Sequence, residues 1–86
     1  MQYIVYIIQS EKKNLFKGFT QNLSISINYH NADKSPSTKG QGVWTLLFTK
    51  GFEEKEDALE YVKMLKMQTD KYIHWLVASN RNEIDA

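Results

Sequence analysis

The sequence predicts a small α+β domain in which helices pack on a three-stranded sheet. Two runs of β-branched and aromatic residues, at 3–9 and 15–20, flank a short polar turn, which is typical of a β-hairpin. A third such run lies at 43–50. After Gly51 the apolar residues recur every three or four positions, which is the period of an α-helix. A hairpin, a return strand and then helices is the chain order of an α+β layer fold.

The first two strands are expected to pair with each other through the polar turn at 10–14. Residues 3–9 are apolar at almost every position, so we expect this strand to be buried. The strand at 15–20 contains Gly18, which indicates a bulge or a close backbone approach to a neighbour. Polar residues, one proline and two glycines make 32–42 a loop before the third strand.

Residues 22–31 can be interpreted in two ways. From Leu23 to Tyr29 apolar and polar residues alternate, which is the period of a strand. Asn22 is a favoured N-cap residue, however, and Leu23 and Ile27 lie four positions apart, which places them on one face of a helix. These residues alone leave both alternatives open.

The C-terminal third of the chain predicts two helices. The first covers 54–67, and its first turn is rich in Glu and Asp, which the helix dipole stabilises. The second begins at about Asp70 and ends at about Ser79. We take 1–80 as one domain and 81–86 as a polar C-terminal tail. The positions expected to face the core are Ala58, Tyr61, Val62, Leu65, Ile73, Leu76 and Val77, with Trp75 beside them.

The composition excludes several classes of protein. The 86 residues make room for one domain, and a content of 42% hydrophobic and 13% aromatic residues excludes an intrinsically disordered chain. No cysteine is present, which excludes a disulfide, a thiolate metal site and a cysteine nucleophile. The longest apolar run, 4–8, is far shorter than the roughly 20 residues of a membrane helix, and the chain opens without a signal-peptide pattern. We therefore expect a cytoplasmic protein with neither a membrane partner nor a small-molecule cofactor.

Charge is unevenly distributed along the chain. The formal net charge is +1, but residues 1–50 carry six lysines against two acidic residues, whereas 51–86 carry five basic against eight acidic residues. The basic half can attract phosphate, although arginine, which is best suited to bidentate phosphate contacts, occurs only as Arg81. The lysines are therefore either a solvated surface or a nucleic-acid-binding set. That set would comprise Lys12, Lys13, Lys17, Lys34 and Lys39.

Four short motifs follow one another along the chain. They are Ile4-Val5-Tyr6, then Phe16-Lys17-Gly18 ten residues later, Asn22-Leu23 with His30-Asn31, and the run from Val43 to Phe48 followed by Asp57-Ala58-Leu59. In this order and at these spacings they resemble the GIY-YIG endonuclease superfamily, especially its short stand-alone bacterial members. The resemblance covers about residues 3–77. It implies that 22–31 is a helix, and hence a three-stranded antiparallel sheet with the element order β-β-α-β-α-α.

The resemblance also implies a chemistry, which is metal-dependent hydrolysis of a DNA phosphodiester. In that family a first tyrosine acts as the general base for the nucleophile or helps to activate that base, and a second tyrosine helps to position the site. An arginine stabilises the charge that develops on the phosphate, and a glutamate binds a divalent cation. Several of these positions depart from the motif in this chain. Tyr6, Gly18 and His30 match, whereas Phe16 stands for the second tyrosine, Ser26 for the arginine and Val62 for the glutamate.

These departures predict an inactive or strongly impaired nuclease that retains nucleic-acid binding, with DNA as a partner. Without the carboxylate, Mg²⁺ has no evident anchor, so we expect no metal site and no cofactor. The first alternative is a divergent, active DNA endonuclease that uses Tyr6 and His30 with Mg²⁺ or Mn²⁺, held by a relocated ligand such as Glu60 or Asp57. The second is a protein-interaction module. Taken without the resemblance, Tyr6 is an ordinary core tyrosine and His30 a structural histidine.

Overall fold

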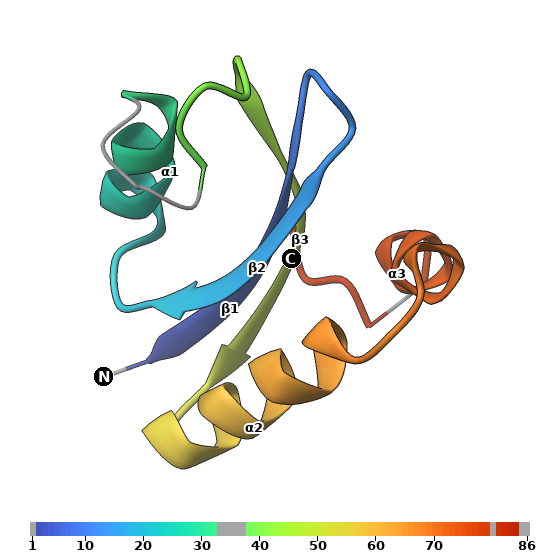
Figure 1. The fold of residues 1–86 in the computed structure, drawn as a ribbon. Helices are drawn as coiled ribbons and strands as arrows, with labels where there is room; N and C mark the ends of the chain where they lie inside the picture. Colours follow the sequence, from blue (N-terminus) through green and yellow to red (C-terminus); the bar gives the residue numbers. More distant parts are fainter. Residues whose placement is uncertain (1, 33–37, 80, 85–86) are drawn as a thin grey trace.

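The computed structural model describes residues 2–32, 38–79 and 81–84. It confirms the predicted α+β class, the three-stranded antiparallel sheet and the order β-β-α-β-α-α (Figure 1). The elements are β1 (Tyr3–Ser10), β2 (Leu15–Thr20), α1 (Leu23–Asn31), β3 (Trp44–Phe52), α2 (Lys55–Lys66) and α3 (Asp70–Val77).

The sheet has the strand order β2-β1-β3, so the first strand lies in the middle. Both pairings are antiparallel, and Tyr6 lies between Gly18 on β2 and Thr49 on β3. The β1–β2 register continues without a shift through Gly18, whereas the β1–β3 register shifts between Ile7 and Ile8. Of the two alternatives for Gly18, the structure therefore has the close approach and places the irregularity on the other side of β1.

Successive side chains of β1 point to opposite faces of the sheet, and each face has its own helices. Val5 and Ile7 pack against α2 and α3, whereas Tyr6 and Ile8 pack on the side of α1. Figure 1 shows this division, with α1 on one side of the sheet and α2 and α3 on the other. The middle strand is thus buried from both sides, as its apolar sequence predicts.

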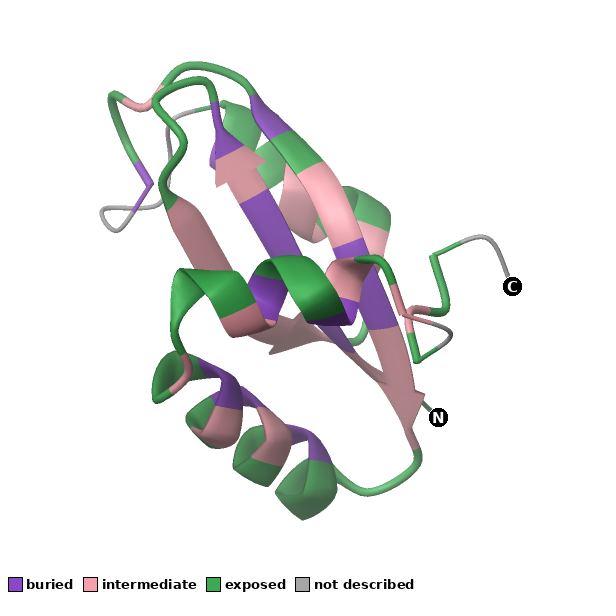
Figure 2. Ribbon diagram, turned by 90° about the vertical axis from the view of Figure 1, so that its right-hand side faces the viewer, coloured by how far each residue is buried: buried purple, intermediate pink, exposed green. Residues whose placement is uncertain are grey.

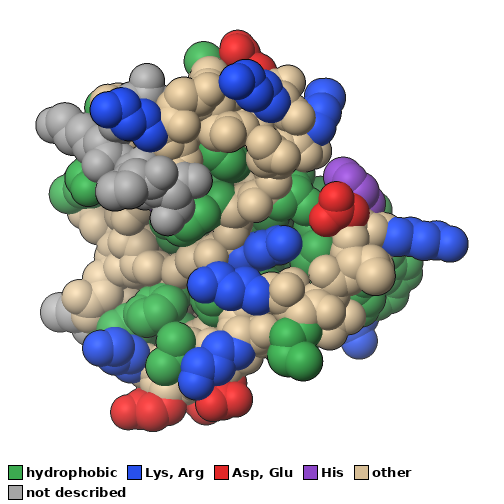
Figure 3. Space-filling model, viewed as in Figure 1, with side chains coloured by type: hydrophobic (Ala, Val, Ile, Leu, Met, Phe, Trp, Pro, Cys, Tyr) green, Lys and Arg blue, Asp and Glu red, His purple; other side chains and the backbone are tan. Residues whose placement is uncertain are grey.

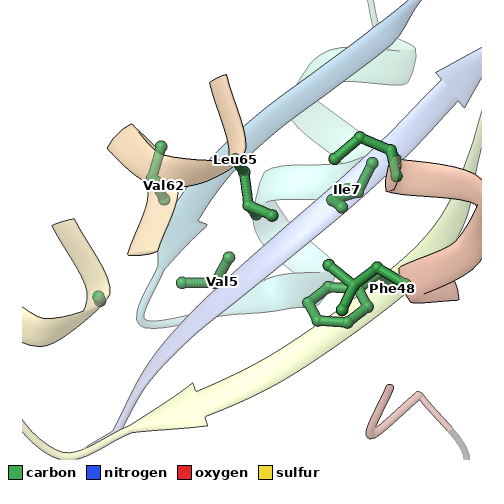
Figure 4. Close-up of a cluster of buried hydrophobic side chains, with 8 residues drawn as sticks. Val5, Ile7, Phe48, Val62 and Leu65 are labelled. Atoms are coloured by element: carbon green, nitrogen blue, oxygen red, sulfur yellow. The ribbon is translucent and has the colours of Figure 1, made fainter. Parts of the chain in front are cut away.

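The larger core lies between the sheet and the helices α2 and α3. In Figure 2 the buried positions of α2 form a stripe that faces the sheet. Figure 4 shows Val62 and Leu65 of α2 pointing toward β1, where they pack against Val5 and Ile7. The buried residues of this core are Val5, Ile7, Phe48, Ala58, Val62, Leu65, Ile73 and Leu76.

Helix α1 explains the ambiguous alternation at 22–31. Asn22 caps the helix, since its side-chain oxygen accepts a hydrogen bond from the Ile25 amide at 3.1 Å. The inner stripe, Leu23 and Ile27, packs against the Tyr6 side of the sheet. A second apolar stripe, Ile25 and Tyr29, is solvent-exposed. Two apolar stripes on one helix produce an alternating sequence that is indistinguishable from that of a strand.

Part of the predicted tail lies along the outer edge of β3. The side-chain oxygen of Asn82 accepts a hydrogen bond from the Thr49 backbone N–H at 3.2 Å. Its side-chain nitrogen donates to the backbone carbonyls of Leu47 and Val77 at 2.8 and 2.9 Å. The Glu83 amide then donates to the Thr49 carbonyl at 2.9 Å. These contacts satisfy backbone groups of an edge strand that the sheet itself leaves unpaired.

Candidate active site

A buried chain of three polar side chains lies between β1, α1 and the loop that follows α1. Tyr6 Oη is 2.9 Å from His30 Nε2, and His30 Nδ1 is 2.9 Å from Thr38 Oγ1. Tyr6 and His30 are only 4% and 5% exposed, and Thr38 is fully buried. The structure thus joins Tyr6 and His30, both predicted site residues, by a hydrogen bond, and it adds Thr38, which belongs to no motif.

Burial also fixes the charge state of this group. Desolvation raises the pKa of Tyr6 and lowers the pKa of His30, because both charged forms lose their hydration. At neutral pH the phenol is protonated and the imidazole is neutral. A neutral imidazole has one donor and one acceptor nitrogen, so of the two hydroxyls, on Tyr6 and Thr38, one donates to His30 and the other accepts from it.

Phe16 and Gly18 on β2 form the wall next to Tyr6. The Phe16 ring lies 4.6 Å from the His30 ring and 6.1 Å from the Tyr6 ring, measured between centroids. A Cβ atom at Gly18 would lie 3.0 Å from Phe16 Cε2 and 3.3 Å from Tyr6 Oη. The glycine is therefore needed for the close packing of these aromatic rings, and Phe16 offers no hydroxyl to the group.

Two hydrogen bonds of Trp44 hold the loop around Thr38 in place. The Trp44 indole donates to the Thr38 carbonyl at 3.2 Å, and the Trp44 amide donates to Asn31 Oδ1 at 2.7 Å. Gly40 and Gly42 both have positive φ, near 80°, which permits the tight turns between the two anchors. Trp44 is buried in the core and also serves as a hydrogen-bond donor to the loop.

Ser26 is engaged at the N-terminal turn of α1. Its Oγ donates to Thr20 Oγ1 at 2.6 Å, and the same Thr20 oxygen accepts from the Asn22 amide at 3.1 Å. Ser26 lies one helical turn before His30, at the position where the resemblance predicts an arginine. In place of a cation, this position thus carries a neutral hydroxyl that fastens α1 to the end of β2.

Val62 lies on the other face of the sheet from Tyr6. It packs with Val5 and Ile7 in the larger core (Figure 4). The two alternative ligands, Asp57 and Glu60, are exposed on α2. The structure therefore does not bring Val62 into the group around the Tyr6 hydroxyl.

The side chains around Tyr6 Oη do not fit a divalent metal such as Mg²⁺ or Mn²⁺. That hydroxyl faces the His30 imidazole, the Phe16 ring and the Gly18 backbone, whereas Mg²⁺ takes oxygen ligands, chiefly carboxylates and water. Across the described ranges, no three His, Asp or Glu side chains gather closely enough to hold a metal ion.

The predicted lysine set lies mostly at the surface near the β1–β2 turn. Lys12, Lys13 and Lys39 are exposed, Lys17 is half-buried on β2, and Lys34 lies outside the described residues. In the part of the chain that the structure describes, the single ion pair joins two other residues, so these four lysines carry unpaired charge. Basic side chains also occupy the middle of the face in Figure 3.

Two of these lysines border a surface depression of about 370 Å³. Lys13 and Lys17 line it together with the edge of the aromatic wall, because Phe16 and Trp44 contribute as well. Its other lining residues are Asn14, Leu15, Gln41 and Asp70. The depression therefore connects a basic surface to the residues that enclose His30.

No helix within residues 2–32, 38–79 and 81–84 is long and apolar enough to span a membrane.

Comparison with known proteins gives a consistent result. The model of the GIY-YIG catalytic domain matches residues 2–73. The UPF0213 protein OB0043 of Oceanobacillus iheyensis is 32% identical over 60 residues, which are 69% of this chain and 70% of that protein. The solution NMR structure of the UPF0213 protein BH0048 of Bacillus halodurans superposes with a TM-score of 0.62 at 26% identity, over 94% of this chain and 87% of that one.

Proposed function

The chain belongs to the GIY-YIG catalytic-domain family, and on that premise we propose that it binds nucleic acid, with phosphodiesterase activity absent or strongly impaired. The family makes DNA the first substrate to consider. The proposal separates two properties that coincide in an active nuclease, namely attraction of the phosphate backbone and chemistry at one phosphate.

The observation that carries the proposal is the state of the Tyr6 hydroxyl. It is buried, protonated at neutral pH, and hydrogen-bonded to a neutral histidine that is itself held by Thr38. A general base or a nucleophile must reach the substrate and have a means of losing its proton. A phenol whose pKa is raised by burial, with no carboxylate or cation in contact, is poorly suited to either role.

Two departures from the motif near Tyr6 support the same conclusion. Phe16 has no hydroxyl and Ser26 has no positive charge, whereas Val62 lies in the larger core on the other face of the sheet. Removal of one positioned charge-stabilising group typically lowers an enzymatic rate by about 10²–10³. The absent positive charge at Ser26 therefore predicts a loss of about two to three orders of magnitude in the rate.

The proposed binding surface is the lysine-bordered depression beside Phe16. Lys13 and Lys17 line it, and Lys12 precedes Lys13 on the turn between β1 and β2. Lysine binds phosphate as a point charge, so the contact is electrostatic and sensitive to salt. Such a surface attracts a nucleic-acid backbone without reading its sequence.

Anisotropy of a labelled 20-base-pair DNA duplex, with EDTA present, tests the binding half of this proposal. We expect affinity to fall steeply between about 50 and 200 mM salt. The double variant Lys13→Gln/Lys17→Gln should reduce the slope of log affinity against log salt by about 2, if each lysine contacts one phosphate. The charge-matched control is Lys55→Gln/Lys63→Gln on α2. Equal effects of the two double variants, or no binding at low salt, would overturn the proposed surface.

Nicking of a supercoiled plasmid in Mg²⁺ or Mn²⁺ tests the other half. We expect no cleavage above the level of Tyr6→Phe protein. The second candidate function is a divergent nuclease, which the 2.9 Å contact between Tyr6 Oη and His30 Nε2 favours, since it resembles a nucleophile–base pair. Metal-dependent nicking that disappears in both Tyr6→Phe and His30→Gln would establish that candidate and refute impaired catalysis.

A further inference from the structure

We infer that the outer surface of α3 is a second nucleic-acid contact, where an unpaired base stacks on Trp75 and its phosphate binds Arg81. This inference rests on the proposed function, because it assumes that the partner is a nucleic acid. It concerns a different part of the molecule, since α3 and the Tyr6 group lie on opposite faces of the sheet (Figure 1).

Trp75 is the reason to consider this surface. The sequence pattern predicts a place beside the core for Trp75, but its side chain is 52% exposed, so that prediction is wrong. Ile73 and Leu76 take the buried positions of α3, and Trp75 falls on the outer side of the helix. An indole ring that is half open to solvent offers a flat apolar surface at a position where packing does not require one.

The neighbours of Trp75 form an aromatic and cationic platform. The Tyr72 ring lies 5.6 Å from the Trp75 ring at an angle of 37°, so it supports the indole from one side. The Arg81 guanidinium lies over the Trp75 ring in a cation–π contact, 5.4 Å from the ring centroid. Aromatic side chains on which bases stack, combined with arginine, are the elements with which proteins hold single strands.

Arg81 is held near Trp75 by its own segment. The next residue, Asn82, is fixed to β3 and to the end of α3 by three hydrogen bonds, and the Arg81 amide donates to Ser79 Oγ at 3.3 Å. The guanidinium therefore projects from an anchored backbone. A cation that is already in position loses less conformational freedom when it binds a phosphate.

The local charges favour an anion. Lys71 precedes Trp75 by one helical turn and is exposed, so it adds a second cation to the same side of α3. The nearby carboxylate of Glu83 is engaged by the Lys50 ammonium at 3.5 Å and by the Gly51 amide at 3.0 Å. Among the described residues Arg81 makes no ion pair. In Figure 3, hydrophobic surface is exposed at the rim over α3, next to basic side chains.

The ligand is an unpaired base because stacking requires a free base face. In a duplex both faces of each base are already covered by neighbouring pairs, whereas a single strand or a frayed end leaves them open. DNA and RNA bases share this flat π-surface. Separate titrations with one DNA strand and one RNA strand show which of the two nucleic acids binds.

The experiment is a fluorescence titration of the full chain with a deoxythymidine dodecamer and, separately, a uridine dodecamer at low salt. Trp44 is buried and Trp75 is exposed, so quenching on binding should come from Trp75 and be absent in Trp75→Phe. By anisotropy of labelled strands, Trp75→Leu should weaken binding about 5- to 100-fold, whereas Trp75→Phe, which keeps an aromatic ring, should retain most of the affinity. Arg81→Gln should reduce the salt slope by about 1. The control is Met67→Leu, at another highly exposed apolar position.

The outcomes separate this inference from the function on which it rests. Quenching by one or both dodecamers, together with the loss of affinity in Trp75→Leu, supports the platform and identifies which nucleic acid it binds. Dodecamers that bind equally well to wild type and Trp75→Leu overturn the platform and leave the proposed function intact. A chain that binds neither dodecamer nor duplex refutes both. Circular dichroism of each variant shows that the fold is retained.

Discussion

His30 determines the geometry of the candidate site, because it is hydrogen-bonded through both ring nitrogens. It joins the first-motif tyrosine to the loop residue Thr38, and its ring packs against Phe16. The same contacts bury the Tyr6 hydroxyl. At the scale of single residues, this hydroxyl is therefore a buried hydrogen-bonding group.

The buried histidine predicts that stability falls in mild acid. Burial lowers the pKa of His30 in the folded chain below its ordinary value of 6.5. The unfolded chain then binds a proton more readily, so His30 contributes full stability above about pH 6.5 and loses it as the pH falls toward the lowered pKa. Urea unfolding at pH 7.5 and 5.5 should show this decrease in wild type and a smaller one in His30→Gln. The control His74→Gln, at an exposed histidine, should behave like wild type; if His30→Gln does so as well, burial of His30 is not the cause.

Gly18 is predicted to tolerate no side chain. An alanine Cβ would meet Phe16 and Tyr6 at 3.0 and 3.3 Å, so Gly18→Ala should destabilise the fold by about 1–3 kcal/mol through overpacking. In a domain of this size that corresponds to a decrease in Tm of roughly 4–8 °C for each kcal/mol. Thermal unfolding measures it, with Gly51→Ala as the control, since a Cβ there meets only the exposed Gln2 side chain. An unchanged Tm for Gly18→Ala would refute the close approach.

At the scale of elements, the sequence predicts strands and helices well where one period dominates. The apolar run of β1 and the helical spacing of α2 each have one structural explanation, and both elements occur where they were expected. Helix α1 was settled only by the family resemblance, because the exposed Ile25 and Tyr29 imitate the alternation of a strand. A pattern of hydrophobicity records which residues are apolar, not which are buried, and Trp75 was misplaced for the same reason.

The candidate site was predictable only in part, for physical reasons. Tyr6 and His30 stand in recognisable motifs, and a hydrogen bond now joins them. Thr38 belongs to no motif, since its role depends on how a loop folds back over His30. Asn82 also belongs to no motif, although its side-chain amide makes the hydrogen bonds to the edge strand β3 that a neighbouring strand would otherwise make.

The Asn82 contact gives a prediction for the edge of the sheet. Asn82→Ala removes the partners of the Thr49 amide and of two carbonyls, so we expect a loss of about 1–3 kcal/mol and faster hydrogen exchange at Thr49. Urea unfolding and amide exchange measure the two effects. Asn28→Ala, at an exposed position of α1, is the control and should change neither. Wild-type exchange at Thr49 in Asn82→Ala would contradict the contact.

At the scale of the whole molecule, the sheet separates stability from the candidate function. The larger core lies with α2 and α3, while the Tyr6 group and the lysine-bordered depression involve α1, β2 and the loop before β3.

The same separation predicts where stability resides. Leu65→Ala opens a cavity in the larger core and should cost about 2–5 kcal/mol. Leu59→Ala, on the outer side of the same helix, should cost well under half of that. Urea unfolding of both variants checks the difference, and similar losses would mean that α2 does not pack on the sheet as described.

An amide NMR titration with a short DNA duplex, in Mg²⁺ and at two salt concentrations, tests the central claim most directly. Our account predicts shifts that cluster at Lys13, Phe16 and Lys17, weaken with salt, and leave the duplex intact on a gel afterwards. Shifts absent even at low salt would contradict nucleic-acid binding. A duplex cleaved by wild-type protein and spared by Tyr6→Phe would contradict the loss of catalysis.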